Sequence, residues 1–354
     1  MTSLARTVRL FTLSLLAIGT ITAETAPAEV ALSLDLPEGA LLAAGPQPDL
    51  EILYTGDVIG YVEDCGCKVN PAGGLARRAW LVGQIKTNYP GTPVVLLDAG
   101  NFSDNPTEKG DLRTAALLKE MAGLGYKAVA VGERDLTMGY DDLAKRIEGL
   151  PMKFISTNIV TQGTRKPIFE PYAIVEVPGR DGKPIRIGVL SVVRYTPVWQ
   201  KSGPAGTNLA AAPVVEMVKT YLPEVRAKSD VVVLMAGLAK DDAHEVARQL
   251  PEIDMLIGSY GGIFSSVEER EGNVPVYYTG NQGKRIGESR ITLDTKRRPS
   301  EIRSYVHFLT AKYPSDKAMA ERVAALSPSN AAAPNAPQLL IPKAGLSVKP
   351  PDSQ

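Results

Sequence analysis

The two cysteines of this 354-residue chain are separated by one glycine, in the stretch Cys65-Gly66-Cys67. Two thiols this close can form a disulfide, share a metal ion or supply a nucleophilic thiolate. Because residues i and i+2 of an extended chain have Cα atoms roughly 6.6 Å apart, a Cys65–Cys67 disulfide would be strained and easily reduced. A nucleophilic role would need a base, and no histidine stands near the pair in the sequence. The disulfide, the metal site and the reactive thiol all stay open as hypotheses.

A metal site would need ligands beyond the thiolates, and polar residues follow several strand-like segments around the cysteines. Thiolates combined with carboxylate and amide oxygens suit one divalent metal, zinc or iron. The candidate metal ligands are Asp57, Cys65, Cys67, Asp98, Asn101 and Glu133. The expected cofactor is therefore one such ion or none.

Arg134 and Tyr260 also follow strand-like segments, and they are candidates for binding a small anionic ligand. A guanidinium can hold a phosphate or sulfate through two parallel hydrogen bonds. The same group repels cations at low dielectric, so the favoured hypothesis for Arg134 is an internal salt bridge in place of a metal. Its partner would be Asp57, Asp98 or Glu133. The candidate catalytic residues are Arg134, Cys65 and Cys67.

Alternating strand and helix signals between residue 50 and about residue 310 must position these side chains. The predicted strands cover 51–56, 93–98, 127–131, 153–157, 185–193, 230–235, 253–257, 275–279 and 286–293. The predicted helices cover 74–88, 110–123, 139–148, 211–227 and 240–250. Hydrophobic runs between amphipathic helices are typical of an α/β fold with a helix-covered parallel or mixed sheet, and 270–310 predicts an antiparallel element. Functional residues of such folds gather at the carboxyl ends of the strands.

Both ends of the chain differ in composition from the region between them. A positively charged start and a short apolar run are typical of a signal peptide over 1–23. We expect a linker over 24–49, a domain over 50–312, and a short helix followed by a Pro/Ala-rich disordered tail over 313–354. The predicted location is periplasmic or secreted, with no transmembrane span in the mature protein.

The net charge of zero gives no electrostatic reason to expect nucleic acid as a partner. The basic clusters Arg77-Arg78 and Lys296-Arg297-Arg298 are short, and we expect them to be solvated surface charge. Of the two histidines, His244 falls in an amphipathic helix and is expected to be solvated. His307 falls in a strand-like segment and is expected to be packed or to lie on an edge strand.

Six stretches in order carry a family resemblance: ILYTGDVIG, GGLARRAWLVGQIK, VVLLDAGN, GLGYKAVAVGERDLTMGYDDL, IDMLIGSYGG and YYTGNQGKRIGESRITLD. From about residue 50 to 295 the chain resembles the metallophosphoesterase domain of the 5′-nucleotidase branch of the calcineurin-like superfamily. The resemblance implies an α/β fold built as a four-layer αββα sandwich, in which two mixed sheets are flanked by helices. It also implies a site among the strand-end loops.

Members of that family hold two divalent metals with Asp, Asn and several His ligands. In the resemblance, Asp57 and Asp98 match such ligands, and Asn101 stands where the family has a bridging aspartate. The remaining ligand positions are occupied by Ile59, Glu133, Arg134, Ala236, Gly237, Tyr260 and Gly262. A chain with two histidines cannot supply the family's full metal site.

The predicted function is therefore that of a degenerate, exported family member that has lost most dimetal ligands. It would be a binding protein, or a thiol redox or metal protein centred on Cys65 and Cys67, with a small anionic ligand or a periplasmic redox partner. The alternative is a 5′-nucleotidase-like, metal-dependent phosphoester hydrolase. Its altered metal site would be built from Asp57, Asp98, Glu133 and the cysteines.

Overall fold

The structure, a computed structural model, describes residues 31–32, 45–195 and 199–326. The predicted signal peptide over 1–23 and the predicted tail beyond residue 326 lie outside the described residues. None of the helices within the described ranges is long and apolar enough to cross a membrane.

The first sheet is mixed and contains the first and the last strand of the described chain. In spatial order its strands are β1 (Ala31–Leu32), β15 (Pro299–Phe308), β14 (Arg285–Leu293), β2 (Leu50–Thr55), β3 (Val94–Asp98), β4 (Tyr126–Ala130) and β5 (Lys153–Ile155). Strands β2 to β5 are parallel, and β14 is antiparallel to both of its neighbours. The predicted antiparallel element thus includes the β14–β15 pair, in which β14 pairs with β2.

The second sheet is also mixed, with antiparallel strands at its two edges. Its spatial order is β12 (Glu269–Glu271), β13 (Val274–Tyr278), β11 (Met255–Gly258), β10 (Val231–Gly237), β8 (Pro184–Val193) and β7 (Tyr172–Pro178). The four central strands are parallel. A separate two-stranded ladder joins β6 (Ile159–Thr161) to β9 (Leu209–Ala211).

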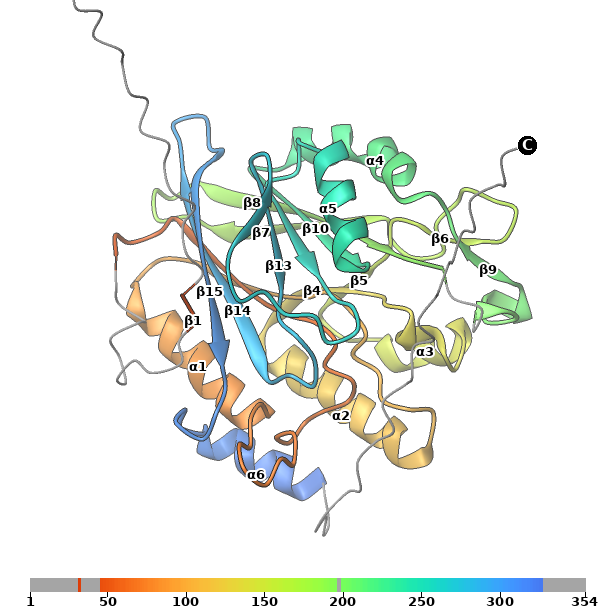
Figure 1. Cartoon of the computed structure of the whole chain (residues 1–354), viewed down its shortest axis with the longest axis horizontal. Helices are drawn as coiled ribbons and strands as arrows, with labels where there is room; N and C mark the ends of the chain where they lie inside the picture. The colour runs from red at the N-terminus through yellow and green to blue at the C-terminus, as the bar shows by residue number, and fades with distance from the viewer. Residues whose placement is uncertain (1–30, 33–44, 196–198, 327–354) are drawn as a thin grey trace, which may run out of the picture.

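Helices cover the outer face of each sheet. The helices are α1 (Leu75–Asn88), α2 (Glu108–Leu124), α3 (Tyr140–Ile147), α4 (Val214–Lys228), α5 (Lys240–Gln249), α6 (Lys317–Leu326) and the short 3-10 helices η1 (Arg134–Leu136) and η3 (Pro204–Gly206). Figure 1 shows α1, α2 and α6 on one side of the molecule and α4 and α5 on the opposite side.

Three apolar layers hold these elements together, and they follow from the alternation of side chains along a strand. On β2, Leu50, Ile52 and Tyr54 point between the two sheets, whereas Leu53 points toward α1 and α2. The third layer packs the second sheet against α4 and α5 through residues such as Leu234. The predicted four-layer αββα sandwich is confirmed, because each sheet buries both of its faces.

Each predicted strand and helix overlaps an observed one, but β7 was not predicted, and β15 was expected only as a strand-like part of the antiparallel element over 270–310. Both alternate buried and exposed residues and contain charged side chains, such as Glu176 and Arg303, that dilute the hydrophobic signal. Within the predicted linker, residues 31–32 form a strand against β15. Beyond residue 312, α6 packs on the first sheet's helices and buries Met319 and Val323.

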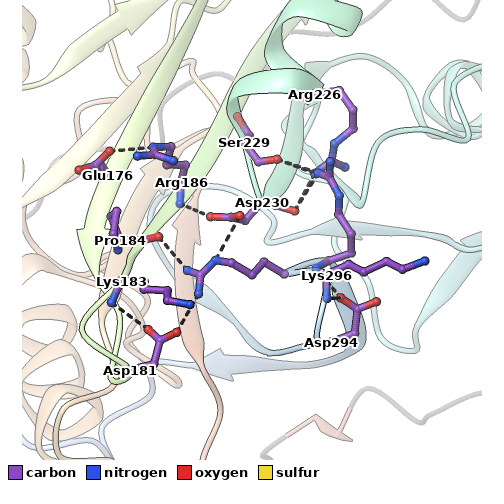
Figure 2. A network of polar contacts seen from close by, with 12 residues as sticks. Glu176, Asp181, Lys183, Pro184, Arg186, Arg226, Ser229, Asp230, Asp294 and Lys296 are labelled. Carbon is purple, nitrogen blue, oxygen red and sulfur yellow. Dashed lines mark hydrogen bonds and ion pairs between the residues drawn. The ribbon is translucent and has the colours of Figure 1, made fainter.

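The cluster Lys296-Arg297-Arg298 was expected to be solvated, which is wrong for its two arginines. Arg297 donates to Asp181 at 3.0 Å, and Arg298 donates to the Ser229 carbonyl at 2.7 Å. Arg226 donates to the same region at the end of α4. These contacts tie the turns at Asp181 and Asp294 to the end of α4, so the cluster is a structural clamp. Figure 2 shows Asp181, Asp294, Arg226, Ser229 and Asp230 of this network.

Candidate functional site

The carboxyl ends of the parallel strands β2, β3, β4 and β11 meet at one end of the sandwich. We call the loops that follow them, 56–62, 99–105, 131–135 and 259–264, the strand-end pole. Hydrogen bonds between these loops show that they contact one another: the Asp57 N–H donates to Gly100, and the Ser259 hydroxyl accepts from Asp57 N. The sequence-predicted candidates therefore do lie on one end of the fold.

Asp57 is buried at the centre of the pole, and protein groups occupy both of its carboxylate oxygens. Asn101 Nδ2 donates to Oδ1 at 2.7 Å, and the Ser259 hydroxyl lies 3.0 Å from the same oxygen. The Gly262 N–H donates to Oδ2 at 3.2 Å. Burial raises the pKa of Asp57, and these three hydrogen bonds oppose that rise.

Asp98 is fully buried and connected to a buried arginine by a chain of hydroxyl groups. Thr55, its register partner on β2, donates to Oδ2 at 2.5 Å, and the Gly100 N–H donates to Oδ1 at 2.9 Å. The Thr55 oxygen lies 3.0 Å from the Tyr126 hydroxyl, which accepts from Arg78 Nη1 at 3.3 Å. Burial raises the pKa of Asp98 to about 6, while the hydrogen bonds and Arg78 act to lower it.

Arg78 corrects a prediction, because it is not solvated surface charge. Its side chain has no exposed area, and its neighbour Arg77 is half-buried. Helix α1 begins after Gly73-Gly74 and turns Arg78 inward toward Tyr126. The guanidinium thus brings a positive charge behind the carboxylate of Asp98.

Asp135 was not among the predicted site residues, yet it fixes two of the loops of the pole. Its Oδ2 accepts the N–H groups of Asn101 at 2.9 Å and Gly132 at 2.7 Å, and its Oδ1 accepts the Ser103 N–H at 2.8 Å. Burial raises the pKa of Asp135 to about 7, although the hydrogen bonds from these N–H groups act to lower it. One sequence signal could have indicated Asp135: a strand of buried type is followed by a glycine, Gly132, and then by an acidic residue three positions later.

The predicted salt bridge of Arg134 is wrong. The guanidinium donates to the Ser103 carbonyl at 3.4 Å and to Asn105 Oδ1 at 3.1 Å. Among the described residues it makes no ion pair with Asp57, Asp98 or Glu133. The backbone N–H of Arg134 donates to the Asn101 side chain at 3.1 Å, while its guanidinium extends to Ser103 and Asn105.

Glu133 and Tyr260 lie at the surface of the pole and share a positively charged neighbour, Arg194. Burial raises the pKa of Glu133, and Arg194 is the main charge that opposes the rise. Arg194 donates to the Tyr260 hydroxyl at 2.6 Å, with its guanidinium carbon 5.3 Å from the ring centre. Arg194, which directly follows β8, was not among the predicted site residues.

Cys65 and Cys67 lie in the exposed loop between β2 and α1, and both are free cysteines in this structure. Gly66 has φ +66°, a left-handed conformation that favours glycine, and its N–H binds Asp64 at 3.1 Å. The Cys65 N–H donates to Ala72 at 2.9 Å, which anchors the loop next to the start of α1.

The two thiols influence each other. Partial burial raises the pKa of the Cys65 thiol, but hydrogen bonds from Cys67 and from the Ala72 N–H, with the charge of Lys284, lower it overall. The hydrogen bond to Cys65 raises the pKa of Cys67. Cys65 is therefore the thiol that ionises first, and Cys67 is the more exposed of the two.

Neither histidine contacts the Asp57 carboxylate in the part of the chain that the structure describes. His244 was expected to be solvated, but its ring nitrogens lie 3.0 and 3.1 Å from Glu271 and Glu269. His307 is buried on β15 and lies 2.6 Å from Glu288, which confirms the prediction of a packed histidine.

Solved structures with the same arrangement decide which fold this is. A 5′-nucleotidase precursor from Thermus thermophilus superposes with a TM-score of 0.66 at 22% identity, over 78% of this chain and 58% of that one. The calcineurin-like phosphoesterase YfkN from Bacillus subtilis superposes with a TM-score of 0.66 at 20% identity, over 79% of this chain and 97% of that one. The chain has the calcineurin-like metallophosphoesterase fold. A thiohydrolase with this fold, SoxB from Thermus thermophilus, superposes with a TM-score of 0.68 at 17% identity, over 82% of this chain and 61% of that one.

Proteins that are similar to this chain in sequence are likewise nucleotidases and phosphodiesterases. The chain is 27% identical over 233 residues to the 2′,3′-cyclic-nucleotide 2′-phosphodiesterase/3′-nucleotidase of Salmonella typhimurium, covering 59% of this chain and 36% of that protein. It is 25% identical over 268 residues to the snake venom 5′-nucleotidase of Gloydius brevicauda, covering 70% of this chain and 44% of that protein. The match thus spans less than half the length of these relatives. No protein-family model matches the chain.

The residues at the pole do not fit the two metals that the metallophosphoesterase fold implies. The oxygens of Asp57 and Asp98 are held by protein donors, and Asn101 turns its NH₂ group, which cannot ligate, toward Asp57. Within the described ranges no group of three or more His, Cys, Asp or Glu side chains could hold a metal ion. The structure therefore does not bring the cysteines together with Asp57, Asp98 or Glu133 as a ligand set.

Proposed function

We propose that this protein is an exported metallophosphoesterase-fold protein in which dimetal chemistry has been replaced by a redox-active thiol pair, Cys65 and Cys67. One observation supports the proposal most directly. The two free thiols lie two residues apart in an exposed loop beside the pole, while the carboxylates that could have held metal are bound to protein donors.

The first support is the composition of the pole. A metal-binding carboxylate needs lone pairs free for the cation, yet Asp57 accepts from Asn101 and Gly262, and Asp98 accepts from Thr55 and Gly100. Removing these partners to admit a metal would leave buried donors unpaired, which costs about 1–3 kcal/mol each. Binding a metal here would therefore have to offset the loss of these hydrogen bonds.

The second support is the division of roles between the thiols. Cys65, whose pKa is lowered, would attack a sulfur atom of a partner disulfide, and that S–S bond would break as the leaving thiolate takes a proton. Cys67, after losing its proton, would attack the Cys65 sulfur and release the second thiol. The net step oxidises two thiols of this protein by two electrons and reduces the partner disulfide to two thiols.

The third support is the predicted location. The signal-peptide-like start over 1–23 favours export, and exported proteins meet an oxidising compartment in which disulfides form. A strained disulfide between residues two apart would have a relatively high reduction potential, so the reverse step, in which the Cys65–Cys67 disulfide oxidises two thiols of a partner, would be favoured there.

Intact-mass measurement in glutathione redox buffers tests the proposal. The protein should lose two hydrogens, reversibly, as the buffer becomes more oxidising, and neither Cys65→Ser nor Cys67→Ser should do so. Thiols that stay alkylatable at every buffer ratio, or that form only mixed disulfides with glutathione, would exclude an exchanging pair.

The second candidate, a metal-dependent phosphoester hydrolase, is favoured by the names of the sequence relatives, which are nucleotidases and phosphodiesterases. Metal analysis of the purified protein, combined with phosphodiester turnover, separates it from the thiol proposal. One or two equivalents of bound divalent metal, with turnover abolished in Asp98→Ala and retained in Cys65→Ser, would establish the hydrolase instead.

A further inference from the structure

Arg285, the first residue of β14, is held between two aromatic rings. Its guanidinium carbon lies 4.0 Å from the ring centre of Phe264 and 4.5 Å from that of Phe308, its register partner on β15. Such contacts fix the plane of the guanidinium and cover its faces. Phe264 itself is 45% exposed, although it is a large apolar residue.

The guanidinium of Arg285 forms no hydrogen bond and no ion pair in the part of the chain that the structure describes, and its Nε is buried without a partner. Other arginines of this protein, such as Arg186 and Arg226, are paired with carboxylates. A partly buried charge without an acceptor is costly, so this guanidinium favours a ligand that supplies acceptors to its exposed nitrogens.

Gly280 lets the guanidinium lie close to the backbone of its loop. A Cβ atom on Gly280 would lie 3.1 Å from Arg285 Nη1, and φ at this position is +80°. The same loop continues to Gln282, whose N–H donates to the Asp57 carbonyl at 2.7 Å. Arg285 therefore stands at the edge of the strand-end pole, directly after a loop that contacts Asp57.

We propose that Arg285, framed by Phe264 and Phe308, binds one oxyanion group of a small molecule: a carboxylate, a sulfate or a phosphate. Because the rings cover the faces, only the guanidinium edge can meet a ligand. That edge matches two oxygens of an oxyanion bidentately. Since Nε is the Arg285 nitrogen that is both buried and unpaired, the two Nη groups are the donors that reach solvent.

Two further properties suit this ligand class. The site has a positive charge without a nearby carboxylate, so an anion would compensate it. Burial lowers the pKa of the guanidinium, and no neighbouring anion among the described residues raises it. A bound anion would therefore stabilise the charged form of Arg285. The proposal does not depend on the thiol chemistry of Cys65 and Cys67.

Arginine-selective NMR tests the site. In protein labelled with ¹⁵N-arginine, the Nε–H resonance of Arg285, assigned by its disappearance in Arg285→Lys, is followed during separate titrations with acetate, sulfate and phosphate at constant ionic strength. We expect a saturable shift of that resonance with at least one anion, and the anion that binds most tightly identifies the group. The absence of a saturable shift with all three anions would overturn the proposal.

Two variants control the measurement. Arg186→Gln removes an exposed arginine paired with Glu176, and it should leave the Arg285 titration unchanged. Phe264→Leu keeps the charge of Arg285 but removes one ring, and it should weaken binding about threefold. A shift of equal size in all exposed arginines would show an adventitious ion only, and would also overturn the proposal.

Discussion

Asn101 donates its side-chain amide to Asp57 Oδ1 at 2.7 Å, and its amide oxygen accepts the backbone N–H of Arg134 at 3.1 Å. One side chain therefore joins the loops that follow β2, β3 and β4. An aspartate has no donor and could not make the first of these bonds. The residue that stands where the family resemblance implies a bridging carboxylate is thus suited to binding another carboxylate, not a cation.

Asn101→Asp should destabilise the protein, because it replaces a donor with a second buried carboxylate next to Asp57. Charge repulsion and the loss of a hydrogen bond together should lower the free energy of unfolding by about 2–4 kcal/mol at pH 7. Urea unfolding, with and without Mn²⁺ or Zn²⁺, measures this. Asn105→Asp makes the same charge change at an exposed position and should have little effect. Full recovery of stability on adding metal would show that a dimetal site can still form.

The hydroxyl chain between Arg78 and Asp98 leads to a second prediction. Tyr126→Phe removes the hydroxyl that lies 3.3 Å from Arg78 Nη1 and 3.0 Å from Thr55, and so leaves buried polar groups unpaired. The free energy of unfolding should fall by about 1–3 kcal/mol in urea titrations. Tyr195→Phe, at a half-exposed tyrosine, should change it by less than about 0.5 kcal/mol. Equal effects of the two substitutions would show that the chain of hydroxyls does not stabilise the fold.

The fold could be predicted from sequence because strand and helix signals depend on local patterns. The long buried runs at β8 and β10 are continuous hydrophobic segments, and the glycines that follow β2, β3, β4 and β11 mark the pole. Side-chain direction could not be predicted in the same way. Arg134 and Arg78 are both arginines near the pole, yet one turns outward to Asn105 and the other is fully buried behind Asp98. Such differences depend on tertiary packing, which no local pattern contains.

A pH-dependent stability should arise from Glu51 on β2. Burial raises its pKa from 4.5 to about 8, with Glu288 adding to the rise and Arg290 opposing it. The folded state therefore holds a proton that the unfolded state releases, so this contribution to stability is complete below pH 4.5 and is lost as pH rises toward 8. At about 1.4 kcal/mol per pKa unit, the loss is at most about 5 kcal/mol.

Glu51→Gln tests this contribution, because the amide stays neutral at every pH. Urea unfolding between pH 5 and pH 8.5 should show a shallower loss of stability for this variant than for the wild type. Glu301→Gln, at an exposed residue of β15, should keep the wild-type slope. Parallel slopes for Glu51→Gln and the wild type would mean that Glu51 is ionised in the folded protein.

The thiol pair gives a last prediction, which concerns Cys65 alone. Its pKa is lowered by the Cys67 thiol, the Ala72 N–H and Lys284 against the effect of burial, so removing the Cys67 donor should raise it. In Cys67→Ala, the pH at which iodoacetamide alkylates Cys65 at half its maximal rate should move upward, because the thiolate is the reactive form. Cys67→Ser keeps a hydroxyl donor and should move it less. Mass spectrometry follows the alkylation of Cys65 in the wild type and in both variants. If the alanine and serine variants both keep the wild-type midpoint, then Cys67 does not stabilise the Cys65 thiolate, and the division of roles between the two thiols is wrong.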